Sequence, residues 1–232
     1  MKRYMDLPRM NRLRRTAKIL SFGGLGILVV ALLLSLGSAN NLGITLGLAL
    51  LGLLTSQMGS ILTRRWPDRG RADQVFDAAL KGLDSRNALF HYLLGGCRHA
   101  LLAPNEALAL VPVYEPGIFD ASRGSLFRTK TKRGEPRGKP GEARHLLDEA
   151  DHEAAALSRE LKKRFPEASP DAHAVLVFFH PEARVNAGST DASVVHVKKL
   201  KEFIRAMPRR SALPTDALAD LEAAFDRLRY DD

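Results

Sequence analysis

The segment from Glu142 to Arg164 carries residue types that bind metal ions, arranged at helical spacing. His145, Glu149 and His152 stand at i, i+4 and i+7, so on a helix they would share one face, with Asp148 nearby. Imidazole and carboxylate groups are ligands for zinc, but a closed site needs a fourth convergent ligand. The sequence supplies none, so we predict no metal site, no cofactor and a solvated helix face.

A thiol and an imidazole lie two residues apart at Cys97 and His99, the residue types of a cysteine nucleophile and its base. On one strand they are expected to share a face. No third group that would orient the imidazole is evident, so a structural pair is expected. Asp73 and Asp77, on a predicted helix, also lack evident partners and are expected at a helix cap and on the surface. The common phosphate-binding glycine loop and serine-nucleophile motifs are absent.

Length, charge and cysteine content limit the possible classes. The 232 residues suffice for one domain with a sizeable core, or for a small domain with appendages. The single cysteine excludes an internal disulfide and does not suggest a secreted disulfide scaffold. The net charge of +9 favours anionic partners, either nucleic acid or lipid head groups, without choosing between them.

Residues 19–63 contain no ionisable side chain. One straight helix of that length would measure about 68 Å, over twice a hydrocarbon core of about 30 Å. Turn-forming residues at 37–41 divide the run into two predicted transmembrane helices, about 19–36 and 42–62. A cleaved signal peptide is the alternative, but the apolar run exceeds the roughly 7–15 residues that such peptides use. We therefore predict a helical hairpin in the membrane.

Basic residues flank both ends of this hairpin, whereas the turn carries no charge. By the positive-inside rule, the basic segment 1–18 and everything after the linker 64–71 lie in the cytoplasm, and the protein is a multi-pass protein of the inner membrane. Gly43 and Gly47 form a GxxxG pair that permits close helix packing. They are expected to pack within the hairpin, with a dimer contact as the alternative.

The remaining residues, 72–232, are expected to form an α/β domain with a mixed sheet, because short apolar runs alternate with amphipathic segments. Helical periodicity begins near residue 72 and returns over 142–164, 198–207 and 215–229. Strands are predicted over 88–94, 99–103, 107–113, 125–128, 172–180 and 193–197. A basic loop rich in glycine and proline is expected over 128–141.

The order of one helix, three strands, one helix and one strand resembles the PD-(D/E)XK nuclease fold, which is the restriction-endonuclease-like fold. Over residues 72–205 the local residues resemble its bacterial nuclease-related domain family. The resemblance is carried by His99, the apolar run 100–103, Pro104 and Gly117-Ile118. It implies a nuclease whose metal is held by an aspartate and the glutamate of a Glu-x-Lys motif.

The chain departs from this pattern at each catalytic position. The aspartate falls at Arg98, the glutamate at Val111 and the lysine at Val113. An arginine repels a divalent cation, and two valines neither bind metal nor activate water. We therefore expect a membrane-anchored, non-catalytic interaction protein on a degenerate nuclease-like scaffold. A membrane-tethered metal-dependent nuclease with a relocated active site is the alternative.

The basic loop supplies the candidate residues for anion binding. It would contact either anionic lipid head groups at the bilayer or nucleic-acid phosphates, unless it is only a solvated linker. The candidates are Arg128, Lys130, Lys132, Arg133, Arg137 and Lys139.

Overall fold

The structure, a computed structural model, divides the chain into two compact units. The described residues are 1–37, 42–65, 72–103, 106–122, 125–129, 141–166, 171–186, 193–207 and 215–230. One unit contains Leu7–Arg71, and the other combines Met1–Asp6 with Ala72–Asp232. The second unit is therefore built from segments that precede and follow the first.

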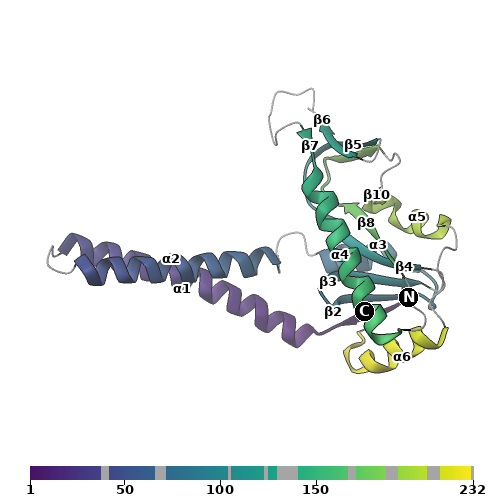
Figure 1. The fold of residues 1–232 in the computed structure, drawn as a ribbon, viewed down its shortest axis with the longest axis horizontal. Helices are drawn as coiled ribbons and strands as arrows, with labels where there is room; N and C mark the ends of the chain where they lie inside the picture. The colour runs from purple at the N-terminus through teal and green to yellow at the C-terminus, as the bar shows by residue number, and fades with distance from the viewer. Residues whose placement is uncertain are drawn as a thin grey trace. The chain divides into compact units, whose positions relative to one another are not determined.

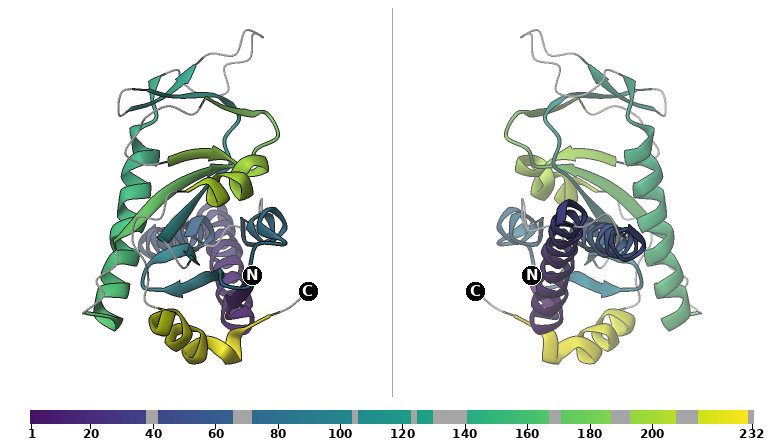
Figure 2. Two further views of the ribbon diagram at one scale, coloured as in Figure 1. Left: turned by 90° about the vertical axis from the view of Figure 1, so that its right-hand side faces the viewer. Right: turned by 90° about the vertical axis from the view of Figure 1, so that its left-hand side faces the viewer.

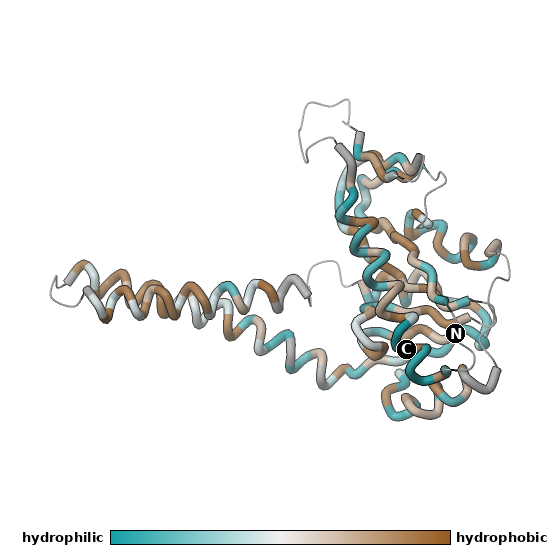
Figure 3. Tube along the Cα trace, viewed as in Figure 1, coloured by the Kyte–Doolittle hydropathy of each residue, from teal (hydrophilic) through white to brown (hydrophobic). Residues whose placement is uncertain are grey.

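Helices α1 (Leu7–Gly37) and α2 (Leu42–Arg65) make up the first unit (Figure 1). Met10–Leu36 and Gly43–Ile61 are each long and apolar enough to cross a membrane. Figure 3 shows hydrophobic residues along most of both helices and polar residues in the first turns of α1. The two predicted apolar helices are thus present, although α1 begins well before residue 19. The turn predicted at 37–41 lies, apart from Gly37, outside the described residues.

The two helices pack through small residues spaced seven positions apart. A Cβ atom added to Gly24 would collide with the backbone of Ser56, and one added to Gly59 would collide with the backbone of Ser21. Only glycine therefore fits at these two positions, and the backbones approach closely. The buried small residues of the two helices are Ala17, Gly24, Ala31, Gly52 and Gly59.

Gly43 and Gly47 do not contribute to this packing. A Cβ atom added to either would meet nothing within 4 Å. With about 3.6 residues per turn, both lie on the side of α2 opposite the buried Gly52. The prediction that this pair packs within the hairpin was wrong, because other glycines occupy the face that meets α1.

The second unit contains a six-stranded mixed sheet in the order β1-β2-β3-β4-β8-β10. Strands β2, β3 and β4 pair antiparallel, while β1 pairs parallel with β2, and β8 pairs parallel with both β4 and β10. These strands are β1 (Lys2–Met5), β2 (Ala88–Leu94), β3 (Cys97–Ala103), β4 (Glu106–Val113), β8 (Ala172–Phe178) and β10 (Ser193–His196).

A smaller sheet, in the order β7-β6-β5-β9, continues from the larger one. The chain runs from β4 into β5 and from β8 into β9. Strands β4 and β8 pair parallel in the larger sheet, and β5 and β9 pair parallel in the smaller one. The strands are β5 (Gly117–Ser122), β6 (Ser125–Thr129), β7 (Gly141–Glu142) and β9 (Ala183–Asn186).

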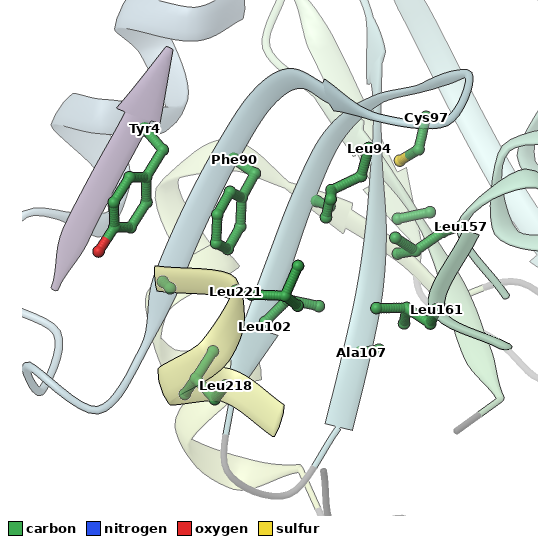
Figure 4. Close-up of a cluster of buried hydrophobic side chains, with 13 residues drawn as sticks. Tyr4, Phe90, Leu94, Cys97, Leu102, Ala107, Leu157, Leu161, Leu218 and Leu221 are labelled. Carbon is green, nitrogen blue, oxygen red and sulfur yellow. The ribbon is translucent and has the colours of Figure 1, made fainter. Parts of the chain in front are cut away.

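Helices cover both faces of the larger sheet. Leu157 of α4 (Arg144–Arg164) and Leu221 of α6 (Thr215–Phe225) belong to one buried cluster, shown in Figure 4. Phe76 of α3 (Ala72–Leu80) and Leu200 of α5 (Leu200–Ala206) belong to a cluster on the opposite face. Figure 2 shows α4 and α5 on opposite sides of the sheet. The apolar runs of β4 and β8 are buried from both sides, as expected for central strands.

Strand β1 forms the edge of the larger sheet, although it precedes the two apolar helices. Tyr4 is buried and stacks on Phe90 of β2, with 4.8 Å between the ring centroids (Figure 4). On its other side Tyr4 bridges to Arg229, and the backbone nitrogen of Tyr230 donates to the carbonyl of Arg3 at 3.1 Å. The N-terminal residues are thus a structural strand, where the sequence analysis described only a basic tail.

The predicted mixed α/β class is confirmed. The predicted strands over 88–94, 107–113 and 193–197 agree with the structure to within a residue, and α4 agrees with the predicted helix to within two. The strands β1, β5, β7 and β9 were not predicted. All four are short, and each pairs with only one or two neighbouring strands, so their pattern is weak.

Candidate functional site

Arg98, where the nuclease-like pattern has an aspartate, is held by two carboxylates of α4. Its Nη2 lies 2.5 Å from Oε1 of Glu149, and its Nε forms an ion pair with Glu153. The backbone nitrogen of Arg98 also donates to Oε2 of Glu153, at 3.1 Å. The positive charge at this position is therefore paired within the fold, and no carboxylate there is left for a divalent cation.

Glu153 carries an acidic group inside the domain, with a side chain that is 5% exposed. Burial raises the pKa of the Glu153 carboxyl, and the charge of Arg98 opposes that rise. Burial lowers the pKa of Arg98, but the two glutamates outweigh it, so that pKa is raised. Burial, followed by the charge of Glu153, raises the pKa of the Cys97 thiol, whose Sγ lies 3.8 Å from Oε2 of Glu153. The thiol therefore stays protonated at neutral pH and is a poor nucleophile.

Val111 and Val113, where the pattern has Glu-x-Lys, are core residues. Both are buried, and they share an apolar cluster with Phe119, Leu146 and Phe178. Their strand has the burial of a central strand, and their side chains offer no ligand for a metal and no group that activates water. At all three pattern positions, the structure thus places a charge-paired or apolar side chain.

Cys97 and His99 lie next to an irregularity of the β2–β3 hairpin. Leu94 pairs with Cys97, whereas His91 pairs with His99, so β2 contains one extra residue between these two pairs. Cys97 points toward α4, while the ring of His99 contacts Phe76 of α3, with 5.0 Å between the centroids. The prediction that Cys97 and His99 share a face was wrong, because the two side chains pack against helices on opposite faces of the sheet.

A chain of polar contacts, which we name the histidine relay, runs from the partly buried Tyr230 and Asp77 to the buried His91 and His99. Nδ1 of His91 lies 2.7 Å from Nδ1 of His99, and both side chains are fully buried. Nε2 of His91 lies 3.3 Å from Oδ1 of Asp77. The hydroxyl of Tyr230 donates to the other carboxylate oxygen of Asp77 at 2.8 Å. The relay thus connects α3, both strands of the hairpin and the C-terminal segment.

The carboxylate determines where the protons of the histidine relay lie. An ionised carboxylate only accepts hydrogen bonds, so Nε2 of His91 carries a proton. With both rings neutral, Nδ1 of His91 accepts from Nδ1 of His99, and Nε2 of His99 is unprotonated. That nitrogen is buried, without a hydrogen-bond partner among the described residues. Burial, followed by the electrostatic effects of the neighbouring His91 and Arg98, holds the pKa of His99 well below its usual range.

Asp77 therefore has partners that the sequence analysis did not find. Burial, followed by the charge of Asp77, raises the pKa of Tyr230, so this hydroxyl remains a donor at neutral pH. Asp73, in the first turn of α3, is also buried. The surface position expected for Asp77 was wrong, since packing of α3 on the sheet leaves its side chain only 15% exposed. Asp73 does lie at the start of the helix, as expected of a residue near the cap, but it is buried there. The available signal was the pair of histidines on neighbouring predicted strands.

The residues on α4 that resembled a metal site have separate partners. Nε2 of His145 lies 3.6 Å from Oε1 of Glu115, and Glu149 pairs with Arg98. His152 is exposed. Within the described ranges, no three His, Cys, Asp or Glu side chains are grouped to hold a metal ion.

Most of the candidate anion-binding loop lies outside the described residues. This applies to Lys130, Lys132, Arg133, Arg137 and Lys139. Arg128, on β6, pairs with Glu115 at 3.1 Å, donates to the carbonyl of Pro116 and lies over the ring of Phe119. Its guanidinium therefore already links β6 to the turn between β4 and β5.

Comparison with known proteins finds no similar family, protein or structure. No protein-family model matches the chain, and neither a curated protein nor a solved structure shows significant similarity to it. The function of the domain must therefore be argued from its own residues.

Proposed function

We propose that the chain is a membrane-anchored, non-catalytic interaction protein whose α/β domain has a degenerate nuclease-like scaffold. The proposal rests on the side chains found at the three positions where the nuclease family has its catalytic groups. Arg98 is neutralised by Glu149 and Glu153, and Val111 and Val113 are buried in an apolar cluster. Metal-dependent cleavage requires carboxylate ligands and an activated water, and these positions supply neither.

The order of elements supports the nuclease-like scaffold. Helix α3 is followed by the antiparallel strands β2, β3 and β4, then by α4 and by β8, which pairs parallel with β4. This is the order that the resemblance to the PD-(D/E)XK fold implies. Since one fold hosts many unrelated functions, such a scaffold without its catalytic groups is compatible with binding in place of catalysis.

The exposed side chains of α1 and α2 support membrane anchoring. Among the described residues, all the exposed large apolar side chains except Tyr114 and Phe127 lie on these two helices. A contiguous apolar surface of this size is unfavourable in water and favourable in a bilayer. Basic residues lie in the first turns of α1 and at the end of α2, as expected where each helix meets the cytoplasmic side.

Strand pairing supports placing both ends of the chain on the same side of the membrane. β1 precedes the hairpin and β2 follows it, yet they pair in register in one sheet. A sheet cannot form across a bilayer, so two crossings must separate the two strands. Together with the flanking charges, this argues for a cytoplasmic α/β domain and an external turn.

Cysteine labelling tests this topology. In a Cys97→Ser background, Asn40→Cys is expected to react with a membrane-impermeant maleimide in intact bacterial cells. Asp231→Cys is expected to react only after the cells are permeabilised. An externally reactive residue 231, or a mature protein that lacks residues 1–39, would contradict the proposed hairpin.

A nuclease assay tests the absence of catalysis. The full chain in detergent micelles should leave DNA and RNA intact in the presence of Mg²⁺ or Mn²⁺. The full chain is required, because a fragment beginning near residue 68 would lack strand β1. Metal-dependent cleavage that is abolished by Glu149→Gln or Asp77→Asn would instead establish a relocated active site.

A further inference from the structure

We infer that the first turns of α1 bind anionic lipid head groups through Arg12 and Arg15. This inference rests on the proposed membrane anchoring and names the partner of that anchor. Lipid head groups were one of the partners expected for the basic loop 128–141, whereas the described residues favour the helix itself as the site of lipid contact. The first three turns of α1 contain basic side chains and no acidic one.

Helix α1 is longer than the hydrocarbon core of a bilayer is thick. The helix continues without a break over 31 residues, which corresponds to about 46 Å at 1.5 Å per residue. The hydrocarbon core of a bilayer is about 30 Å thick, so part of the helix must extend beyond it. The uninterrupted uncharged run of α1 begins at Ile19, which leaves the basic turns before it at the level of the head groups.

Two basic and two apolar side chains share one exposed face of α1. Arg12, Arg15, Ile19 and Phe22 follow one another at intervals of three or four residues, so they line one side of α1. All four side chains are exposed. They lie on the side of α1 opposite the buried Ala17, which belongs to the row of small residues that packs on α2. The two guanidinium groups therefore stand directly above the apolar surface that lipid tails would cover.

The position of the two arginines along the helix axis places them near the lipid phosphates. Arg15 lies about 6 Å and Arg12 about 10 Å beyond Ile19 along the helix axis. The head-group layer of one leaflet is about 5–7 Å thick. Arg15 therefore lies within this layer, and Arg12 lies just beyond it, where its long flexible side chain can turn back toward the lipid phosphates. Both groups form bidentate hydrogen bonds with phosphate.

Lipid competition on the full chain tests the inference. Protein purified in detergent is exposed to equal amounts of phosphatidylglycerol and phosphatidylcholine, and native mass spectrometry counts the bound lipids of each kind. The parent is expected to prefer phosphatidylglycerol, and the variant R12Q/R15Q to lose about fivefold of that preference for each arginine. R184Q/R227Q is the matched control, because it removes two exposed charges from the α/β unit. The control should bind like the parent.

Flotation of each variant with vesicles separates failure of this inference from failure of the proposed function. A parent chain that does not float with vesicles would overturn membrane anchoring itself. A parent that floats but binds both lipids equally would overturn only the role of Arg12 and Arg15. The same conclusion would follow if R184Q/R227Q lost as much preference as R12Q/R15Q, since total charge would then explain the binding.

Discussion

Replacing Arg98 with methionine is expected to lower the free energy of unfolding of the α/β unit by about 3–5 kcal/mol. Methionine keeps an unbranched apolar stem at this position but removes the charge that balances Glu153. The Glu153 carboxylate is 5% exposed, so water cannot replace the lost partner. The carboxyl group must then either remain charged in an apolar setting or take up a proton, and both destabilise the fold at neutral pH.

The single cysteine provides the measurement. Cys97 is buried beside Glu153, so a maleimide reaches it only when the unit unfolds. Labelling of the full chain in detergent micelles as a function of urea concentration therefore reports the unfolding of this unit. The midpoint of labelling should fall sharply for Arg98→Met.

Two further variants identify the cause of that loss. R98M/E153Q should recover much of the stability, because the amide is neutral and still accepts from the backbone nitrogen of Arg98. Arg164→Met breaks an i,i+4 pair with Glu160 on the same helix and the contact of Arg164 with the ring of Phe225, and together these should cost only about 1 kcal/mol. If Arg98→Met costs no more than Arg164→Met, Glu153 does not depend on a buried ion pair.

The elements with strong local patterns were predictable from sequence. The run of residues 174–178 in β8 is continuous and apolar, as burial on both faces requires, and α4 has a clear apolar stripe. Strand β1 has no comparable pattern, since two of its four residues are basic. It becomes a strand only because Tyr4 finds Phe90 on a neighbouring strand more than eighty residues away. A contact between residues so far apart in the chain cannot be predicted from the local sequence.

The histidine relay shows why the candidate site was harder to predict than the fold. Extending the Leu94–Cys97 pairing back along the hairpin would place His91 opposite Ala100. The bulge near Tyr92, whose φ of 60° is unusual for a residue with a side chain, shifts the register by one. His91 then meets His99. One unpredicted backbone conformation thus brings the two histidines opposite each other.

Acidification is expected to destabilise the α/β unit through His99. The pKa of this imidazole is depressed in the fold, so below its ordinary value of about 6.5 the unfolded chain binds a proton that the folded chain does not. The free energy of unfolding therefore rises with pH in this range, by up to about 1.4 kcal/mol per pH unit. The full contribution is present above about pH 6.5 and is lost progressively as the pH falls below that value.

A variant that cannot take up this proton separates His99 from the other titrating groups. His99→Asn keeps a donor toward His91 but has no titrating nitrogen, so its unfolding free energy should depend less steeply on pH between 6.5 and 5. His152→Gln removes an exposed histidine from α4 and should keep the slope of the parent. The comparison uses slopes, so any constant loss of packing energy in His99→Asn does not affect it. Equal slopes in all three proteins would mean that the folded state accommodates the extra proton. Asp77 would then have to stabilise a positively charged His91–His99 pair, and His99 would keep an ordinary pKa despite its burial.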